Sequence, residues 1–166
     1  MAELATQDRL QPSLLDRLID NEPHLSQESR DKRVLSMKRL REAVVRDVGW
    51  LLNTTNYCPQ EALEKYPFVA QSVLNYGMQD LTGKAVPGID LVQKERQLRQ
   101  ALWSFEPRLI RETLKVRIKS SDKKMCRNAF TVELEGQLWA EPSPLQIYMK
   151  TEIDLESGEV RVIDLQ

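Results

Sequence analysis

The spacing of apolar residues changes at Pro107, and this change constrains the fold more than any other feature of the sequence. Before Pro107, apolar residues recur every three or four positions, the spacing of an amphipathic helix. After Pro107, they alternate with polar residues, which is typical of strands with one covered face. Helices followed by such strands predict an α+β domain, in which the helices pack on the apolar face of the sheet.

Two long helices are expected in the first part of the chain. The first begins near Ser36, and its apolar residues share one face: Met37, Leu40, Val44, Val48 and Leu51. The polar residues 53–56 would end it. The second begins at Asp90, whose side chain can cap a helix, and ends at Pro107, because a proline ring removes a donor and clashes with the preceding turn.

Shorter helical pieces are expected on either side of the first long helix. Residues 66–77 contain no charged side chain, so we expect them to be largely buried, with Pro67 near a helix start and Gly77 at its C-terminal cap. Together with the long helices, they would pack on one face of the sheet.

An antiparallel sheet of about four strands is expected in the C-terminal part. Alternation is clear in residues 114–119, 130–138, 145–155 and from 160 onwards. The short turns between these segments favour antiparallel neighbours and one covered face.

The N-terminal region 1–33 differs from the rest. Its apolar residues Leu14, Leu15, Leu18 and Ile19 form one stripe on a short helix, and the residues after it are polar and charged. Such a helix can pack on its own domain or on a partner. Because the tether has few apolar residues to hold the helix, we expect the helix to dock into an apolar groove of a partner. The chain thus divides into a docking helix with a tether, 1–33, and a single domain, 34–166.

Charge and length exclude several classes of protein. The 166 residues suit one domain. The 24 basic and 25 acidic residues leave a net charge of -1, which removes the long-range field of a general nucleic-acid binder or a polybasic membrane protein. The charged N-terminus does not resemble a signal peptide, and no apolar run reaches the roughly 20 residues that cross a bilayer. These features predict a soluble, cytoplasmic protein without direct membrane insertion.

The residues that usually bind metals or perform catalysis are sparse. Cys58 and Cys126 lie far apart, and His24 is the only histidine, so no zinc ligand set or nucleophile–histidine pair is evident. No glycine-rich loop follows a strand, which disfavours phosphoryl transfer and dinucleotide binding. We therefore expect neither a metal nor a cofactor.

A catalytic interpretation would rest on carboxylates, as in a glycosidase. The candidates are Glu106, Asp80 and the pair Glu133 and Glu135. Since that pair alternates on a strand beside the basic strand 115–119, a cross-strand ladder of opposite charges is the favoured alternative.

Glu106, Pro107 and Arg108 form a charged triplet at the junction between helix and sheet. Phe105 and Leu109 can anchor the segment in the core, while the rigid proline fixes the directions of the two charges. Physical reasoning leaves two roles open: an internal salt bridge that closes the helix, or a recognition site for a partner.

Several motifs occur together with this triplet and in a fixed order. They are residues 12–18, Arg46-Asp47, residues 51–54, residues 72–77 with Asn75, Tyr76 and Gly77, and residues 105–109. With this order, the chain resembles the TssE family, the wedge components of the bacterial type VI secretion baseplate. That family belongs with the baseplate wedge proteins of contractile-tailed phages, once described as lysozyme-like. One departure is residues 78–80, Met-Gln-Asp, where the family often has Leu-Pro-Asp.

The resemblance implies a structural subunit without enzymatic activity. It implies a wedge with TssF, TssG and TssK, assembled at the inner face of the bacterial envelope, where the sheath of TssB and TssC begins to polymerise. The triplet Glu106, Pro107 and Arg108 is implied to contact the sheath or the wedge core. A lysozyme-like, carboxylate-dependent glycoside hydrolase is the alternative.

Overall fold

The computed structural model describes residues 13–19, 23–24, 36–58, 60–83, 90–120, 129–140 and 143–164. The order of its α-helices, 3-10 helices (η) and β-strands is α1 Leu14–Leu18, α2 Met37–Asn53, η3 Gln60–Leu63, α3 Pro67–Ala70, η4 Val73–Asn75, α4 Leu91–Phe105, η6 Arg111–Thr113, β1 Lys115–Ser120, β2 Ala129–Leu138, β3 Leu145–Asp154 and β4 Val160–Asp164. The predicted α+β class is confirmed. Most of the tether and Cys126 lie outside the described residues.

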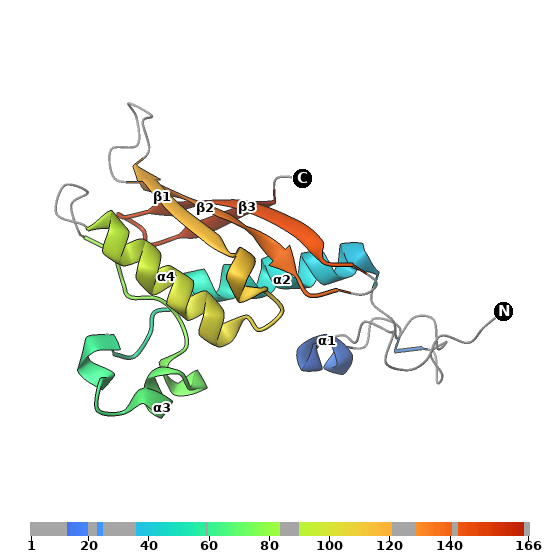
Figure 1. Cartoon of the computed structure of the whole chain (residues 1–166), viewed down its shortest axis with the longest axis horizontal. Coiled ribbons are helices and arrows are strands. Elements are labelled where there is room, and N and C mark those ends of the chain that lie inside the picture. Colours follow the sequence, from blue (N-terminus) through green and yellow to red (C-terminus); the bar gives the residue numbers. More distant parts are fainter. Residues whose placement is uncertain are drawn as a thin grey trace.

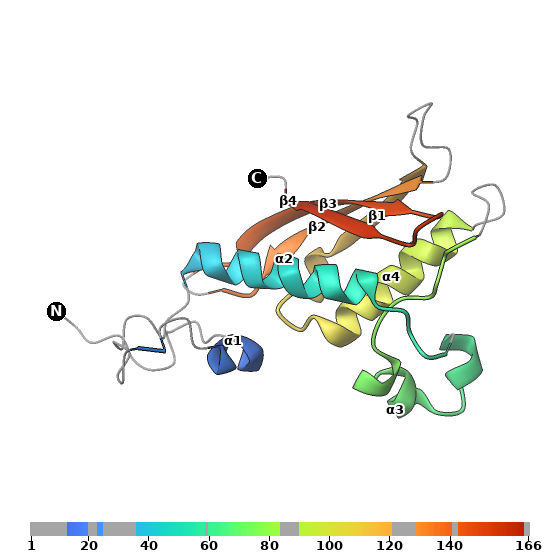
Figure 2. The same cartoon turned by 180° about the vertical axis from the view of Figure 1, so that it is seen from behind.

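The four strands form one antiparallel sheet in the order β1-β2-β3-β4. Both long helices lie side by side on the same face of this sheet, as Figures 1 and 2 show from opposite sides. Helix α4 packs on β1, and helix α2 packs on β4 and β3. Two layers therefore enclose the core, as the change of periodicity at Pro107 predicts.

Helices α2 and α4 begin at the expected caps. The Ser36 hydroxyl accepts a hydrogen bond from the backbone N–H of Arg39 at 3.2 Å, and Asp90 accepts from Val92 and Gln93 at 3.0 and 3.1 Å. The predicted faces enter the core, with Leu40, Val44, Val48 and Leu51 buried on α2 and Leu98 and Leu102 buried on α4.

Alternation in the strands matches their burial. On β3 the residues that face the helices are Ile147, Met149, Thr151 and Ile153, all of them buried. Their neighbours along the strand are half-buried or exposed. Among the described residues, no helix is long and apolar enough to span a membrane.

The expectation that residues 66–77 are largely buried is wrong. Phe68 is 89% and Val73 is 82% exposed, although Asn75 is buried. The segment folds into the short helices α3 and η4, which lie on the side of the helical layer away from the sheet (Figures 1 and 2). Its apolar side chains therefore have no second layer to cover them, so the absence of charge alone did not indicate burial.

Gly77 does not cap a helix as predicted. It has φ 117°, and a Cβ atom there would lie 2.3 Å from the carbonyl oxygen of Thr54. The next residue, Met78, donates a backbone hydrogen bond to Thr54 at 2.7 Å and accepts one from Asn56 at 2.9 Å. A glycine is thus required because two backbone segments approach closely.

Candidate functional site

The triplet lies at the C-terminal end of α4, where the helical layer meets the sheet. The backbone N–H of Glu106 closes the helix on the carbonyl of Leu102 at 2.9 Å. The Arg108 carbonyl accepts from Trp139, just beyond β2, at 2.8 Å, and Leu109 is buried and bridges to Leu138. The backbone of the triplet is therefore fixed to both layers.

Glu106 and Arg108 form a two-point ion pair. The Nε of Arg108 donates to Oε1 of Glu106 at 2.7 Å, and Nη2 donates to Oε2 at 2.6 Å. Only 4% of Glu106 is exposed. Two parallel bonds of this kind hold the planar guanidinium in one orientation. The internal salt bridge, one of the two roles that the sequence allows for the triplet, is thus present. It does not exclude a contact between the triplet and a partner.

Asp47, on α2, extends this pair. Its Oδ2 accepts from Nη2 of Arg108 at 2.5 Å, and its Oδ1 accepts from Nε of Arg46 at 2.9 Å. Burial lowers the pKa of Arg108, but the hydrogen bonds and negative charges of Glu106 and Asp47 outweigh it and raise that pKa above its ordinary value. Arg108 therefore stays positively charged.

Asp16, on α1, ends the series. Its Oδ1 accepts from Nη1 of Arg46 at 2.5 Å, and its Oδ2 accepts from the Ser13 hydroxyl at 2.6 Å. The hydrogen bond from Arg46 holds the pKa of Asp16 below its ordinary value and raises the pKa of Arg46 in return. We call this series the charge network; it consists of Glu106, Arg108, Asp47, Arg46 and Asp16.

The structure thus joins two motifs, the triplet and Arg46-Asp47, that are far apart in the sequence. Asp16 was missed as a site residue. The available signal was an acidic residue three positions after a capping serine, on the helix face opposite the apolar stripe.

Asn75, Tyr76 and Gly77 support the network from the segment that carries α3 and η4. The Tyr76 ring packs edge-on against Phe105, with ring centroids 5.2 Å apart. Its hydroxyl lies 3.5 Å from the carbonyl oxygen of Asp47. Burial raises the pKa of Tyr76, and the charges of Asp47 and Glu106 add to that shift. Asn75 accepts from the backbone of Cys58 at 3.0 Å, so these residues tie the segment to α2 and α4.

The apolar residues of α1 face away from the domain. Leu14 is 72% and Leu18 is 73% exposed, Leu15 and Ile19 are exposed as well, and no residue of the helix is buried. Helix α1 contacts α2 through the ion pair between Asp16 and Arg46. The docking of this stripe on a partner stays a prediction.

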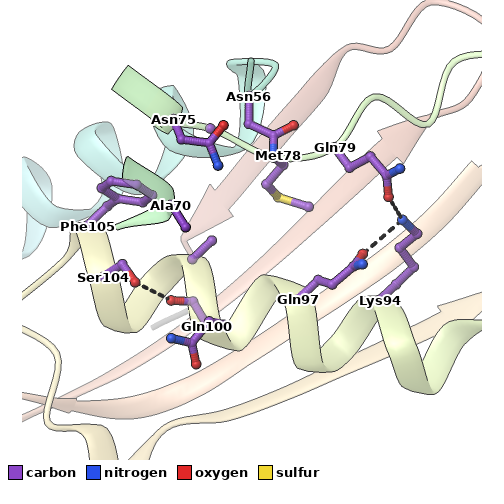
Figure 3. Close-up of a pocket in the computed structure, with 12 residues that line it drawn as sticks. Asn56, Ala70, Asn75, Met78, Gln79, Lys94, Gln97, Gln100, Ser104 and Phe105 are labelled. Atoms are coloured by element: carbon purple, nitrogen blue, oxygen red, sulfur yellow. Dashed lines mark hydrogen bonds between the residues drawn. The ribbon is translucent and has the colours of Figure 1, made fainter. Parts of the chain in front are cut away.

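A small pocket lies between α4 and residues 56–79 (Figure 3). Five of its twelve lining residues carry amide side chains, and Lys94 donates to both Gln79 and Gln97 within it. None of the carboxylates considered for catalysis lines the pocket. Glu133 and Glu135 instead pair with Lys119 and Lys115 across the strands, at 2.7 and 3.7 Å, as a cross-strand ladder requires. Among the described residues, no group of three or more His, Cys, Asp or Glu could hold a metal ion.

Comparison with known proteins identifies a family. The family model described as baseplate wedge protein gp25 matches residues 38–143, which run from the first turn of α2 to the loop after β2. The match includes the triplet, Arg46-Asp47 and residues 72–77. No curated protein and no solved structure matches the chain.

Proposed function

The chain belongs to the baseplate wedge protein gp25 family, a family of structural baseplate subunits, and from this we propose that it is the TssE-type wedge subunit of a type VI secretion baseplate. In this role it joins the wedge to the first ring of the sheath and initiates sheath polymerisation in the bacterial cytoplasm, at the inner face of the envelope. The wedge partners are TssF, TssG and TssK, and the sheath partners are TssB and TssC.

One observation carries the proposal: the charge network holds Arg108 at the junction of the two layers. The bonds of Arg108 to Glu106 and Asp47 use Nε and Nη2, and about a fifth of its side chain is exposed. A guanidinium fixed in this way loses little conformational entropy when it binds a second acceptor. This preorganisation favours recognition of a partner through the triplet.

The second proposed contact is the apolar stripe of α1. Its four exposed apolar side chains suit an apolar groove on a wedge partner. Sheath subunits would instead approach the edge of the sheet, where strands can pair with backbone groups.

We propose that this function is not enzymatic. Both carboxylate oxygens of Glu106 accept hydrogen bonds from Arg108, and both of Glu133 accept from Lys119. Carboxylates committed to such pairs support an assembly role better than acid–base catalysis.

The experiment compares binding and stability in the same variants. Arg108→Ala and Glu106→Gln are tested against Glu133→Gln, a control on the exposed ladder. Loss of one charged hydrogen bond is worth about 1.5 to 3 kcal/mol when it is shielded from water, so we expect roughly tenfold or greater weakening of binding to purified TssF–TssG. Calorimetry gives the affinity, and thermal melting gives the folded fraction.

The control should bind like the parent chain. If binding by the folded fraction of Arg108→Ala and Glu106→Gln is unchanged, the triplet serves only internal stability, and the proposed recognition role fails.

A further inference from the structure

Asn75 lines the small pocket between α4 and residues 56–79, and only 5% of the residue is exposed. Its Oδ1 accepts from the backbone N–H of Cys58 at 3.0 Å. Because that N–H can only donate, the bond fixes the amide with its oxygen towards Cys58 and its nitrogen on the other side. Among the described residues, none accepts a hydrogen bond from Nδ2 of Asn75. Buried polar groups in folded proteins are almost always paired, so this donor indicates an acceptor from outside the described chain.

Ser104 lines the same pocket from α4. Figure 3 shows the nitrogen of Asn75 pointing towards this helix. The Ser104 hydroxyl donates its single proton to the carbonyl of Gln100 at 3.0 Å, so towards a ligand its oxygen can only accept. The pocket thus offers an open donor on one wall and an open acceptor on the facing wall.

The pocket carries little charge. Lys94 is the only charged residue among the described residues that line it, and it lies about three turns of α4 from Ser104. A carboxylate beside Asn75 would therefore lose its hydration without gaining an ion pair, which is costly. An ammonium or guanidinium group could not accept a hydrogen bond from Asn75. These properties favour a neutral polar ligand.

The size of the pocket restricts this ligand to a small group. Its volume is about 50 Å³, whereas sites for drug-sized molecules hold roughly 300 to 1,000 Å³. A primary amide has an acceptor oxygen and a donor nitrogen on separate atoms, so it can accept from Asn75 and donate to Ser104 at the same time. A hydroxyl group would have to make both bonds through one atom. The pocket therefore suits the side-chain amide of an asparagine or a glutamine.

The surroundings of the pocket indicate that this amide belongs to a protein. Val73 and Leu74, which precede Asn75 on η4, are 82% and 74% exposed. A partner that covers them would exclude water from the pocket, and hydrogen bonds at the centre of such a contact contribute most to affinity. Helices η4 and α1 both lie on the side of the helical layer away from the sheet (Figures 1 and 2). This is the side of the proposed wedge contact, whereas the sheath contact is proposed for the edge of the sheet.

We propose that this pocket receives an asparagine or glutamine side chain of a wedge subunit, whose amide oxygen accepts from Nδ2 of Asn75 and whose amide nitrogen donates to Oγ of Ser104. The inference rests on the proposed function, and it adds a further contact site and the chemistry of the group that it binds. The site is formed before binding, because the bond of Asn75 to Cys58 and the bridge between Thr55 and Met78 already hold its outer wall in place. Binding therefore requires little ordering of the chain.

The first test uses the isotopically labelled full chain and acetamide as the probe. Acetamide should shift the side-chain NH₂ signal of Asn75 in NMR spectra, with saturation in the millimolar range expected of so small a ligand. Sodium acetate at the same concentrations should leave that signal in place. Equal shifts with acetamide and acetate, or no shift with acetamide, would overturn the inference.

The second test measures binding of variants to purified TssF–TssG. Asn75→Asp keeps the acceptor for Cys58 and replaces the open donor by a carboxylate oxygen, so we expect roughly tenfold or greater weakening. Gln146→Glu makes the same exchange of groups at an exposed position of β3 and is the matched control, which should bind like the parent chain. Ser104→Ala removes the acceptor with a residue that favours helices, so thermal melting should show a folded domain while binding weakens roughly two- to tenfold.

The outcomes separate this inference from the proposed function. Unchanged wedge binding by folded Ser104→Ala would overturn the inference, as would weakened binding to TssB–TssC in place of TssF–TssG. Failure of the parent chain to bind TssF–TssG would instead overturn the proposed function, and the acetamide titration would still decide whether the pocket binds an amide.

Discussion

The guanidinium of Arg108 contacts two carboxylates of different exposure, and the more buried one contributes more to stability. Glu106 is buried, so its removal leaves a partly buried positive charge with half of its partners. Breaking buried pairs costs about 3 to 5 kcal/mol, whereas exposed pairs contribute about 1 kcal/mol or less. Asp47 has 22% of its side chain exposed and lies between these limits. Glu106 is therefore the residue of the charge network that most affects stability.

Asp16 provides a pH-dependent prediction at the same scale. Its folded pKa lies below the ordinary value of 3.8, so its stabilising contribution is present above that value and is lost as pH falls through the folded pKa. We expect Asp16→Asn to lower the free energy of unfolding by about 1 kcal/mol between pH 5 and 8. The difference from the parent chain should shrink below about pH 4.

Urea denaturation at several pH values measures this difference. Glu135→Gln, in an exposed pair with Lys115, is the control for a general change in charge. A difference that grows as the pH falls below 4 would contradict the assigned sign.

Only part of the charge network could be predicted from the sequence. Glu106 and Arg108 are two residues apart, so their pairing was an open alternative from the start. Asp47 is 61 residues from Arg108, and Asp16 is 30 from Arg46, so neither pair has a characteristic spacing. Only the folded chain brings such charges together, because no local sequence pattern indicates that two distant charged residues will pair.

Helix α1 is stabilised by contacts outside its own hydrogen bonds. With five residues it is far shorter than an isolated helix that is stable in water. The Ser13 cap and the ion pair between Asp16 and Arg46 fix it, while its apolar stripe contributes no buried residue. The element therefore presents apolar surface in a set orientation and adds little to the core.

Deletion of residues 1–24 tests this description. We expect the thermal midpoint to fall by only a few degrees, because only a partly exposed ion pair is lost from the described domain. Binding to the proposed wedge partners should weaken much more, since the whole stripe is removed. A matched variant with Leu14 and Leu18 changed to Ser should reproduce the binding loss, and unfolding of the truncated chain would place the helix in the core.

Elements in which apolar residues recur at a regular spacing could be predicted from the sequence. The exposure of residues 66–77, which lack such a spacing, could not. Helix α2 and strand β3 follow from spacings of three or four and of two residues. Residues 66–77 have no such period, and their apolar character fits both a buried helix and an exposed one. Their exposure depends on where the chain leaves the helical layer, and the bridge between Thr55 and Met78 that ties down both ends of this excursion is a contact between residues distant in the sequence.

At the scale of the whole molecule, the charge network lies where separate layers meet. It begins beside the sheet at the triplet, passes through α2 and ends on α1. The two surfaces proposed for partners, the triplet and the stripe of α1, are thus joined by consecutive ion pairs that run from the end of α4 across α2 to α1. Such an arrangement fits an adaptor that must hold two partners in a fixed relation.

The whole protein should not cleave peptidoglycan. Glycoside hydrolysis requires an acid and a second carboxylate about 5 to 10 Å apart, across a cleft that holds the sugar. Here Glu106 is clamped by Arg108 at the end of α4, whereas Glu133 lies on the exposed ladder, where the hydrogen bond from Lys119 lowers its pKa. A lowered pKa is the reverse of what a general acid needs. Release of soluble muropeptides by the purified chain, with a lysozyme as positive control, measures the activity. Cleavage above background that disappears in Glu106→Gln would show that the Glu106 carboxylate takes part in catalysis, and the proposal of a purely structural role for the triplet would then be wrong.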